Sequence, residues 1–325
     1  MSEKKYANVG GQAVIEGIMM KSPLSTVLAV RRPDGEIEIR PLAGSDSKRP
    51  AVAKWPLIRG LVSFVSSLSV GYKALMLSAE IAGVEEPKDE KDDKKNNKLM
   101  TSLLLGLSAV LGVALAIGLF VFIPTLVTEL IQYIAKIPDL GAWKALIQGI
   151  IRIIIVLIYV AAVSLMKDIR RLFQYHGAEH KTIFCFEARE ELTVENVRKQ
   201  SRFHPRCGTS FLLIVLIISI VFFSCLSLIP GFSYLNEHLP YVFMIVKLLF
   251  LPVVAGISFE ILRFCGRHDN WLTRILSAPG MAFQRLTTAE PDDSQIEVGI
   301  AALKESLKNP DTGELDYEAA YRKKT

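Results

Sequence analysis

The most chemically informative part of the sequence is the pentapeptide His176-Gly177-Ala178-Glu179-His180, which has the pattern H-x-x-E-H. On a helix, residues four positions apart lie on one face, so both imidazoles can reach a single ion. Glu179, next to the second histidine, could act as a base on a metal-bound water. We therefore predict a metal centre with His176 and His180 as ligands and Glu179 as the catalytic residue.

His204 and Cys207 form a second pair of metal-binding side chains, with the spacing H-x-x-C. Both pairs lie in the polar segment 167–210, between two apolar blocks, so both are tethered to the same membrane face. Three imidazoles and one thiolate would make a tetrahedral set, which suits Zn²⁺ or another borderline divalent metal. If His204 or Cys207 does not bind, one position stays open for water, and Glu179 could take its proton.

A simpler interpretation is also open. The histidines could be polar residues at a membrane interface, and Gly177 lowers the helix propensity of the pentapeptide by about 1 kcal/mol relative to alanine. The neighbouring basic side chains could contact anionic lipid headgroups or a phosphate-bearing substrate, or reflect only the charge bias of a cytoplasmic loop. His268 with Asp269 is a weaker candidate for a further ligand or supporting group. The basic residues are Arg170, Arg171, Lys181, Arg198, Lys199, Arg202 and Arg206.

The composition is that of a membrane protein. Half of the 325 residues are apolar, and the net charge is +5. In a membrane protein such an excess usually marks the cytoplasmic face, so no nucleic-acid partner is expected. The first residues lack the apolar core of a signal peptide, so neither cleavage nor export is expected. The four cysteines include no C-x-x-C pair and do not suggest a disulfide framework.

Two regions, 99–166 and 211–262, each predict two transmembrane helices, because their apolar blocks are near the roughly 20 residues that a bilayer core requires. Pro124 should kink or end the first helix. The loops near 135–143 and 230–240 contain one Lys and no Arg, whereas 167–210 contains nine Lys and Arg. By the positive-inside rule that segment and both termini should be cytoplasmic.

Residues 1–50 predict a small cytoplasmic β-rich element. Two strand-like runs, 28–32 and 36–40, flank Pro33-Asp34-Gly35, a turn signal because Pro presets φ and Gly tolerates positive φ. We expect a β-hairpin there, preceded by either a strand or a glycine loop over 9–17.

Three further segments complete the predicted organisation. Residues 52–82 have apolar residues at helical spacing, interrupted by serines and basic residues, and predict an amphipathic helix on or under the membrane rather than a span. Residues 84–98 are a charged linker. The tail 263–325 should contain an interfacial helix anchored by Trp271, and residues 297–307 should form a short helix that docks weakly or frays.

Four sequence blocks, spread over about residues 8–293, resemble the YqhQ-type family of bacterial membrane proteins. That family is described as uncharacterised, sometimes as a predicted metal-dependent enzyme. The resemblance implies a bacterial inner-membrane location and marks the same motifs as the functional core, but it implies no substrate. The blocks are Gly10–Met20, His176–Lys181, His204–Ser210, and Gln284–Thr288 followed by Glu290-Pro291.

The sequence therefore predicts a mainly α polytopic membrane protein with about four transmembrane helices, a small N-terminal β-hairpin element and interfacial helices. Its predicted function is that of a metal-dependent hydrolase acting at the cytoplasmic face on a peptide or a lipid-linked substrate. The alternative is a non-enzymatic assembly, translocation or transport factor with a structural metal or none. The expected partners are the lipid bilayer and either anionic lipid or another membrane protein.

Overall fold

The computed structural model describes residues 7–42, 58–84, 106–108, 110–137, 140, 143–265, 268 and 270–321. The chain divides into two compact units. One, here called the sheet unit, comprises residues 1–87, 160–214 and 255–325; the other, the helical unit, comprises residues 88–159 and 215–254. The predicted charged linker, 84–98, lies outside the described residues apart from Val84.

The N-terminal element is a four-stranded antiparallel sheet with the strand order β1-β2-β3-β4. The predicted hairpin is confirmed as β3 and β4, and its turn has Gly35 at a φ of +91°. The sheet is larger than the hairpin alone, because the glycine-containing segment before it forms a second hairpin. The strands are β1 (Gly10–Val14), β2 (Gly17–Lys21), β3 (Thr26–Arg31) and β4 (Ile37–Leu42).

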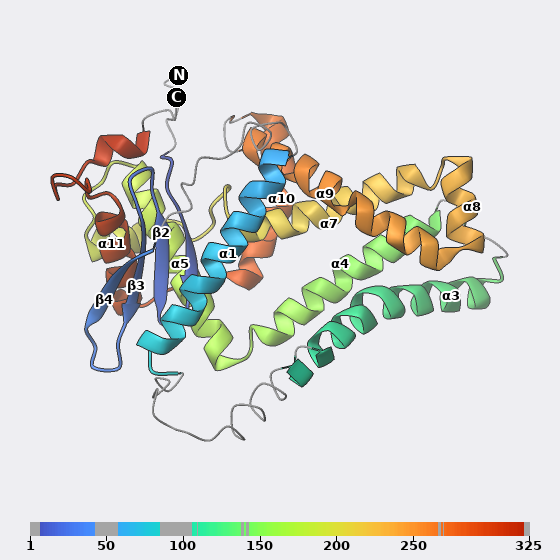
Figure 1. Ribbon diagram of the computed structural model, residues 1–325, viewed down its shortest axis with the longest axis horizontal. Helices are drawn as coiled ribbons and strands as arrows, with labels where there is room; N and C mark the ends of the chain where they lie inside the picture. The colour runs from blue at the N-terminus through green and yellow to red at the C-terminus, as the bar shows by residue number, and fades with distance from the viewer. Residues whose placement is uncertain are drawn as a thin grey trace. The chain divides into compact units, whose positions relative to one another are not determined.

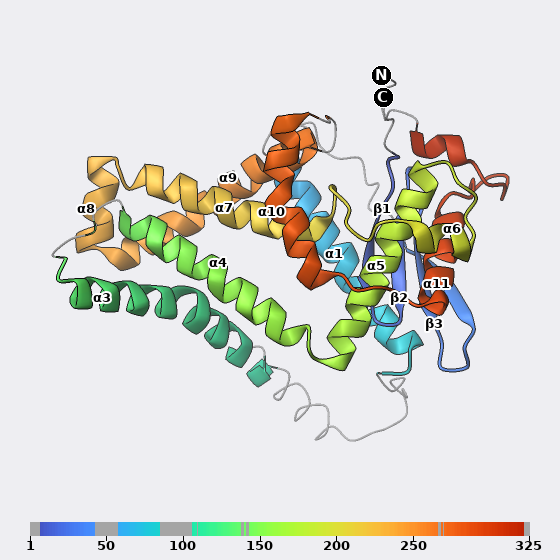
Figure 2. The same ribbon diagram turned by 180° about the vertical axis from the view of Figure 1, so that it is seen from behind.

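Helices cover both faces of this sheet (Figures 1 and 2). Helix α1 (Ile58–Ile81) lies on one face, and α5 (Lys167–Glu187) and α11 (Asp293–Ser306) lie on the other. Side chains alternate between the two faces, as strand geometry requires. Met19, Leu28 and Val30 pack in the cluster with α1, and Ile18, Met20 and Ala29 pack in the cluster with α5 and α11. The strands are therefore apolar on both sides.

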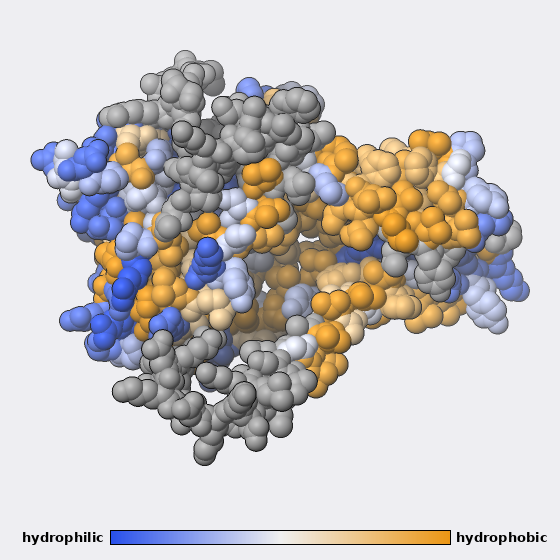
Figure 3. Space-filling view, viewed as in Figure 1, coloured by the Kyte–Doolittle hydropathy of each residue, from blue (hydrophilic) through white to orange (hydrophobic). Residues whose placement is uncertain are grey.

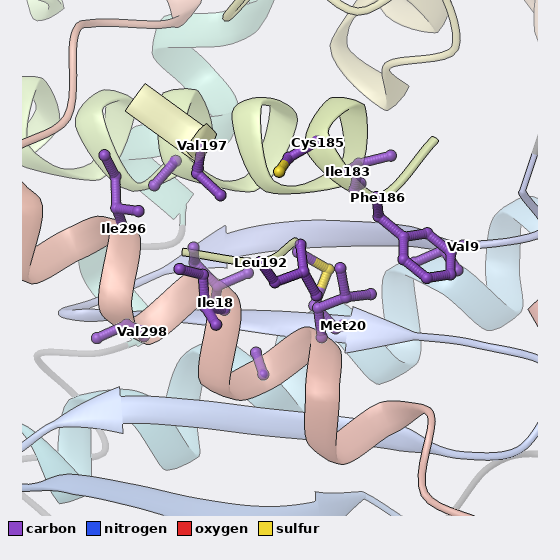
Figure 4. Packing of buried hydrophobic residues seen from close by; sticks show 14 of the residues in the cluster. Val9, Ile18, Met20, Ile183, Cys185, Phe186, Leu192, Val197, Ile296 and Val298 are labelled. Atoms are coloured by element: carbon purple, nitrogen blue, oxygen red, sulfur yellow. The ribbon is translucent and has the colours of Figure 1, made fainter. Parts of the chain in front are cut away.

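Helix α11 is part of the core, and the prediction that it docks weakly or frays is wrong. Ile296, Val298 and Leu303 are fully buried in one cluster with side chains of α5 and the sheet. Figure 4 shows Ile296 and Val298 in this cluster. Each such side chain contributes roughly 1.5–3 kcal/mol by its removal from water. The helix starts with a capping box formed by Asp292 and Gln295. Its partners come from residues far away in the sequence, which the local pattern does not reveal.

Four helices among the described residues are long and apolar enough to cross a membrane, as predicted. Helix α1 is not one of them. Apolar side chains dominate the surface of the helical unit (Figure 3). The four are Gly106–Ala135, which includes the π-helical turn η2 (Gly118–Phe122) and α3 (Ile123–Ala135); α4 (Trp143–Val163); α7 (Gly208–Leu226); and Ile245–Cys265 of α9 (Pro240–Cys265).

The first of these helices changes its winding just before Pro124 and continues beyond it, so it does not end there. The π-helical turn η2 ends directly before α3, in which Pro124 occupies the first turn. Proline has no N–H, so the carbonyl of Phe120, four residues earlier, lacks its usual helical donor. Arg152 of α4 donates to that carbonyl from Nε at 2.8 Å. An arginine in an apolar helix is thereby satisfied by a backbone group that proline has freed.

The remaining helices are short or amphipathic. Helix α8 (Pro230–His238) lies in the connection between α7 and α9, and α6 (Val194–Lys199) contacts α5 and α11. Helix α10 (Trp271–Thr287) exposes Trp271 and Ile275 near its start and buries Gln284 and Thr287 near its end. The 3₁₀ helix η3 (Tyr317–Tyr321) follows α11.

Candidate metal centre

Helix α5 carries the H-x-x-E-H pentapeptide in its buried half. The side chains of His176, Glu179 and His180 are all buried between the sheet and the end of α10. The two imidazoles share a helical face, and their ring centroids lie 4.4 Å apart. The predicted pairing of His176 and His180 on one helix is therefore present.

Cys207 joins this pair. The ligand atoms of His176, His180 and Cys207 all lie within 4.8 Å of one another, which is close enough for one ion. Nε2 of His176 lies 3.1 Å from the Cys207 sulfur. Nε2 of His180 is buried and has no hydrogen-bond partner among the described residues. Such an orphaned buried nitrogen is costly unless a ligand completes it, so the donor set fits a divalent metal.

The other ring nitrogen of each histidine is held by a backbone carbonyl. Nδ1 of His176 lies 2.8 Å from the carbonyl oxygen of Thr287, and Nδ1 of His180 lies 2.6 Å from that of Arg202. Each Nδ1 must therefore donate, which leaves the lone pair on Nε2, the atom that faces Cys207. Metal-binding histidines are commonly oriented in this way. Burial lowers the pKa of His180 and further favours the neutral ring.

His204 lies beside this group and is not one of its members. Its ring centroid is 5.6 Å from that of His180, and the side chain is 4% exposed. Its Nδ1 accepts a hydrogen bond from the backbone of Arg206 at 3.3 Å. Its Nε2, like that of His180, is buried without a hydrogen-bond partner among the described residues, and it lies 3.5 Å from Oε2 of Glu187. Burial lowers the pKa of His204 to about 4, so the ring is neutral and its one proton faces Glu187. The ligand role of His204 stays a prediction, and this tautomer offers no lone pair toward the group.

Cys207 lies immediately before α7, where the helix begins. Its sulfur accepts a hydrogen bond from the backbone N–H of Thr209 at 3.3 Å and lies 3.0 Å from the Thr209 hydroxyl. The N-terminus of a helix favours negative charge, because its first N–H groups point at the ligand. The start of an apolar helix thus positions the one thiol of the group.

Glu179 faces the sheet rather than solvent. The backbone amides of Gly11 and Ala13 in β1 face its carboxylate and favour its charged form. Its Oε2 is buried and has no hydrogen-bond partner among the described residues. Burial raises the pKa of the Glu179 carboxyl, although the neighbouring histidines and the two amides act in the opposite direction. One carboxylate oxygen is therefore available for another ligand, as a catalytic role would require.

Gln284, the first residue of the motif Gln284–Thr288, supports the site from α10 and was not predicted as a site residue. This side chain is fully buried, accepts a hydrogen bond from the His204 N–H at 2.7 Å, and donates to the His204 carbonyl at 2.7 Å and to Ser210 Oγ at 2.8 Å. It fixes the loop that carries Cys207. The signal was present, since Gln284, Thr287 and Thr288 are polar residues at helical spacing, but only the fold shows what they contact.

The basic residues around the site are largely neutralised within the protein. This arrangement argues against a dedicated phosphate site, because an anionic substrate would have to compete with carboxylates that are already in place. The pairs are Arg171 with Glu16, Lys181 with Glu290, Arg198 with Asp293, Arg202 with Glu290, and Arg206 with Glu187.

The remaining histidines do not join the cluster. Nδ1 of His268 lies 3.1 Å from the carbonyl oxygen of Phe264, and the ring of His238 stacks on Tyr234. His268 is therefore not a ligand of this group, and Asp269 lies outside the described residues.

Gly177 has a structural reason to interrupt the helical motif. A Cβ atom at this position would overlap the carbonyl oxygen of Ala289, in the segment whose Ala289 N–H donates to the Phe173 carbonyl at 2.8 Å. We expect Gly177→Ala to displace that segment and with it the Thr287 carbonyl that orients His176. The gain of about 1 kcal/mol in helix propensity should be outweighed, and metal affinity should fall about 10- to 100-fold.

This prediction is checked by isothermal titration of the detergent-purified variants with Zn²⁺ and by their melting temperatures. Gly208→Ala is the matched control, since it adjoins Cys207 and an added Cβ there meets nothing within 4 Å. Equal affinities of the two variants would show that the 287–290 segment does not orient the site.

Comparison with known proteins agrees with the motifs. The family described as "Protein of unknown function (DUF1385)" matches residues 55–309. The "Uncharacterized protein YqhQ" of Bacillus subtilis (strain 168) is 35% identical over 304 residues, which cover 92% of this chain and 92% of that protein. No solved structure matches significantly. The chain therefore belongs to the DUF1385 family, the family of YqhQ that its sequence motifs resemble.

Proposed function

We propose that this protein is a membrane-embedded, metal-dependent hydrolase. His176, His180 and Cys207 would hold a divalent metal, for which Zn²⁺ is the first candidate. The observation that carries the proposal is that ligand atoms of two imidazoles and one thiol lie within 4.8 Å of one another, while both Nδ1 atoms are held by backbone carbonyls. Three protein ligands leave a fourth position for water or substrate, which is the arrangement of catalytic rather than structural zinc sites.

In this proposal the protein side chains have separate tasks. A bound divalent ion would polarise a substrate carbonyl and lower the pKa of water. Glu179 would take a proton on the carboxylate oxygen that is free of hydrogen bonds. The internal pairing of the basic residues favours a substrate whose scissile group is uncharged, such as a peptide or a lipid-linked amide or ester.

The proposed location is the bacterial inner membrane, with both termini and the 167–210 segment cytoplasmic. The four apolar helices support insertion into a bilayer, and the charge of the loops supports the orientation. Anionic lipid or another membrane protein at the cytoplasmic face is the proposed additional partner.

One observation favours a second function. All three proposed ligands are buried, with 7%, 1% and 6% exposure for His176, His180 and Cys207. A closed four-ligand sphere, completed by His204, would indicate a structural metal in a non-enzymatic assembly, translocation or transport factor.

Cobalt substitution distinguishes the two functions. We expect Co²⁺-loaded protein to show a thiolate charge-transfer band and to change its visible spectrum when acetohydroxamate binds the open position. A Co²⁺ spectrum that acetohydroxamate leaves unchanged would favour the structural metal. Absence of stoichiometric metal in the purified protein would reject both metal functions.

Glu179→Gln tests the catalytic part of the proposal. The variant should retain a full complement of Zn²⁺, because Glu179 is not a ligand, and should lose hydrolysis by about 100-fold or more, because removing a positioned general base typically has an effect of that size. Metal content is measured by elemental analysis, and hydrolysis is measured with peptide and lipid-ester substrate panels. Unchanged turnover in a metal-replete variant would remove Glu179 from the mechanism.

A further inference from the structure

We propose that strand β1 is a positioning element of the metal centre, in which Gly11 provides the space and the amides of Gly11 and Ala13 provide the donors that fix the Glu179 carboxylate. This inference rests on the proposed function for its catalytic meaning, but its structural part can be tested independently. It assigns a role to part of the glycine-containing block Gly10–Met20, which is one of the four sequence motifs.

The donors come from the free edge of the sheet. Strand β1 is an edge strand, paired only with β2 through Gly11 opposite Met20 and Ala13 opposite Ile18. In an antiparallel strand, alternate residues direct their amides to the same side. Gly11 and Ala13 are two residues apart, and the amides of both face the Glu179 carboxylate. The free edge of β1 would otherwise have unpaired N–H groups. Here those groups face the Glu179 carboxylate of α5.

The space depends on glycine at position 11. A Cβ atom there would lie 2.9 Å from Cγ and 3.0 Å from Cδ of Glu179, and 2.8 Å from the carbonyl oxygen of Met19. These separations are too short for carbon contacts, so the Glu179 side chain would have to move. At Gly10, one residue earlier, an added Cβ would meet nothing within 4 Å.

Other contacts fix β1 relative to α5. A displaced Glu179 carboxylate therefore cannot be followed by a matching shift of the strand. In the turn after β1, Glu16 adopts a φ of +51° and accepts hydrogen bonds from Arg171 and, at 3.1 Å, from the Tyr175 hydroxyl, both on α5. On the opposite face, the Ile15 N–H donates to Ser78 Oγ of α1 at 3.2 Å. The strand is thereby fixed to the helix that carries the metal-binding histidines.

As a consequence, the Glu179 carboxylate is constrained on one side and has one oxygen, Oε2, free of hydrogen bonds to the part of the chain that the structure describes. The amides of β1 hold the group, while Oε2 stays buried without a hydrogen-bond partner among the described residues. A base that is held in this way is positioned before substrate arrives. Loss of such positioning by about 1 Å can lower turnover about 100-fold without loss of the catalytic group itself.

The test compares Gly11→Ala with Gly10→Ala in the full-length, detergent-purified protein. Gly11→Ala should lower the melting temperature by roughly 3–10 °C, as overpacking a tight site does, and Gly10→Ala should leave it unchanged. The shift should persist in a Glu179→Gln background, which keeps Cγ and Cδ, and should shrink in a Glu179→Ala background, which removes them. An equal shift in all three backgrounds would assign the effect to the Met19 carbonyl alone and overturn the inference.

A second measurement reports positioning rather than stability. Acetohydroxamate binding to the Co²⁺-loaded protein should weaken about 10-fold in Gly11→Ala, which displaces the charged hydrogen-bond acceptor, and in Glu179→Gln, which removes its charge. The Co²⁺ content should be unchanged in both. Gly10→Ala should bind like the wild type. Where a hydrolysed substrate is found, Gly11→Ala should lower kcat and leave KM unchanged.

Wild-type affinity in Gly11→Ala, with the Glu179→Gln effect intact, would overturn the inference and leave the proposed function standing. A wild-type protein that binds no metal would instead reject the proposed function. In that case the stability comparison alone decides whether β1 positions Glu179.

Discussion

Protein carrying His180→Ala should no longer copurify with stoichiometric metal, and its affinity for Zn²⁺ should fall by more than the roughly 10- to 100-fold that loss of a supporting residue causes. His180 offers a buried Nε2 that no described protein group satisfies, and its Nδ1 is held by the Arg202 carbonyl. Removing one of three proposed ligands leaves two, too few to hold zinc in a tetrahedral site. Elemental analysis and isothermal titration of the detergent-purified variant measure this loss.

Two further variants make the result specific. Cys207→Ser conserves volume and should also lose metal, because a neutral hydroxyl is a poor substitute for a thiolate on a borderline metal. His238→Ala removes an exposed histidine that stacks on Tyr234 and should retain metal. If all three variants bound Zn²⁺ like the wild type, the buried histidines would be polar core residues, and the simpler interpretation of the motif would hold.

The predictions that proved correct depend on local patterns. Gly35 supplies the positive φ of the β3–β4 turn, and long apolar runs gave four helices able to span a membrane. The four-residue spacing of His176 and His180 needs only a helix to bring the rings together. Each inference uses a short stretch of chain, in which geometry follows directly from residue type and spacing.

The supporting residues could not be predicted in this way. Gln284 contacts a backbone segment 80 residues earlier in the chain, and the Thr287 carbonyl that orients His176 lies 111 residues away from it. The two hairpins and α11 come together only when the sheet is covered on both faces. From the sequence, Gly177 is a helix-weakening position and Gly11 lies in a strand or a glycine loop, and only the fold places the Ala289 carbonyl and Glu179 against them.

The difference between His204 and the other two histidines follows from the same long-range contacts. All three are buried, and the sequence offers no reason to separate them. Backbone carbonyls lie at Nδ1 of His176 and His180, whereas a backbone amide lies at Nδ1 of His204. The first two rings therefore direct a lone pair from Nε2, and the third directs a proton toward Glu187. For the proposed metal centre, this difference in hydrogen-bond partner favours three protein ligands over four.

Gln284→Leu should be the most damaging substitution among residues that do not touch the proposed metal. Leucine has a similar volume but cannot replace the three hydrogen bonds of the Gln284 amide, so the N–H and carbonyl of His204 are left buried without this partner. Each unsatisfied buried group costs about 1–3 kcal/mol. The melting temperature should therefore fall by roughly 5–10 °C, and Zn²⁺ affinity should fall about 10- to 100-fold.

The control for this substitution is Gln200→Leu, which removes an amide whose hydrogen bond to Glu190 is exposed. Thermal unfolding in detergent and Zn²⁺ titration should show little change there, since exposed polar contacts contribute little. If Gln284 positions Cys207 through the 204–207 loop, Gln284→Leu should lower the Zn²⁺ affinity as well as the melting temperature. If Gln284→Leu lowered the melting temperature but left Zn²⁺ affinity intact, the 204–207 loop would be held by Cys207 itself, and Gln284 would serve only the stability of the core.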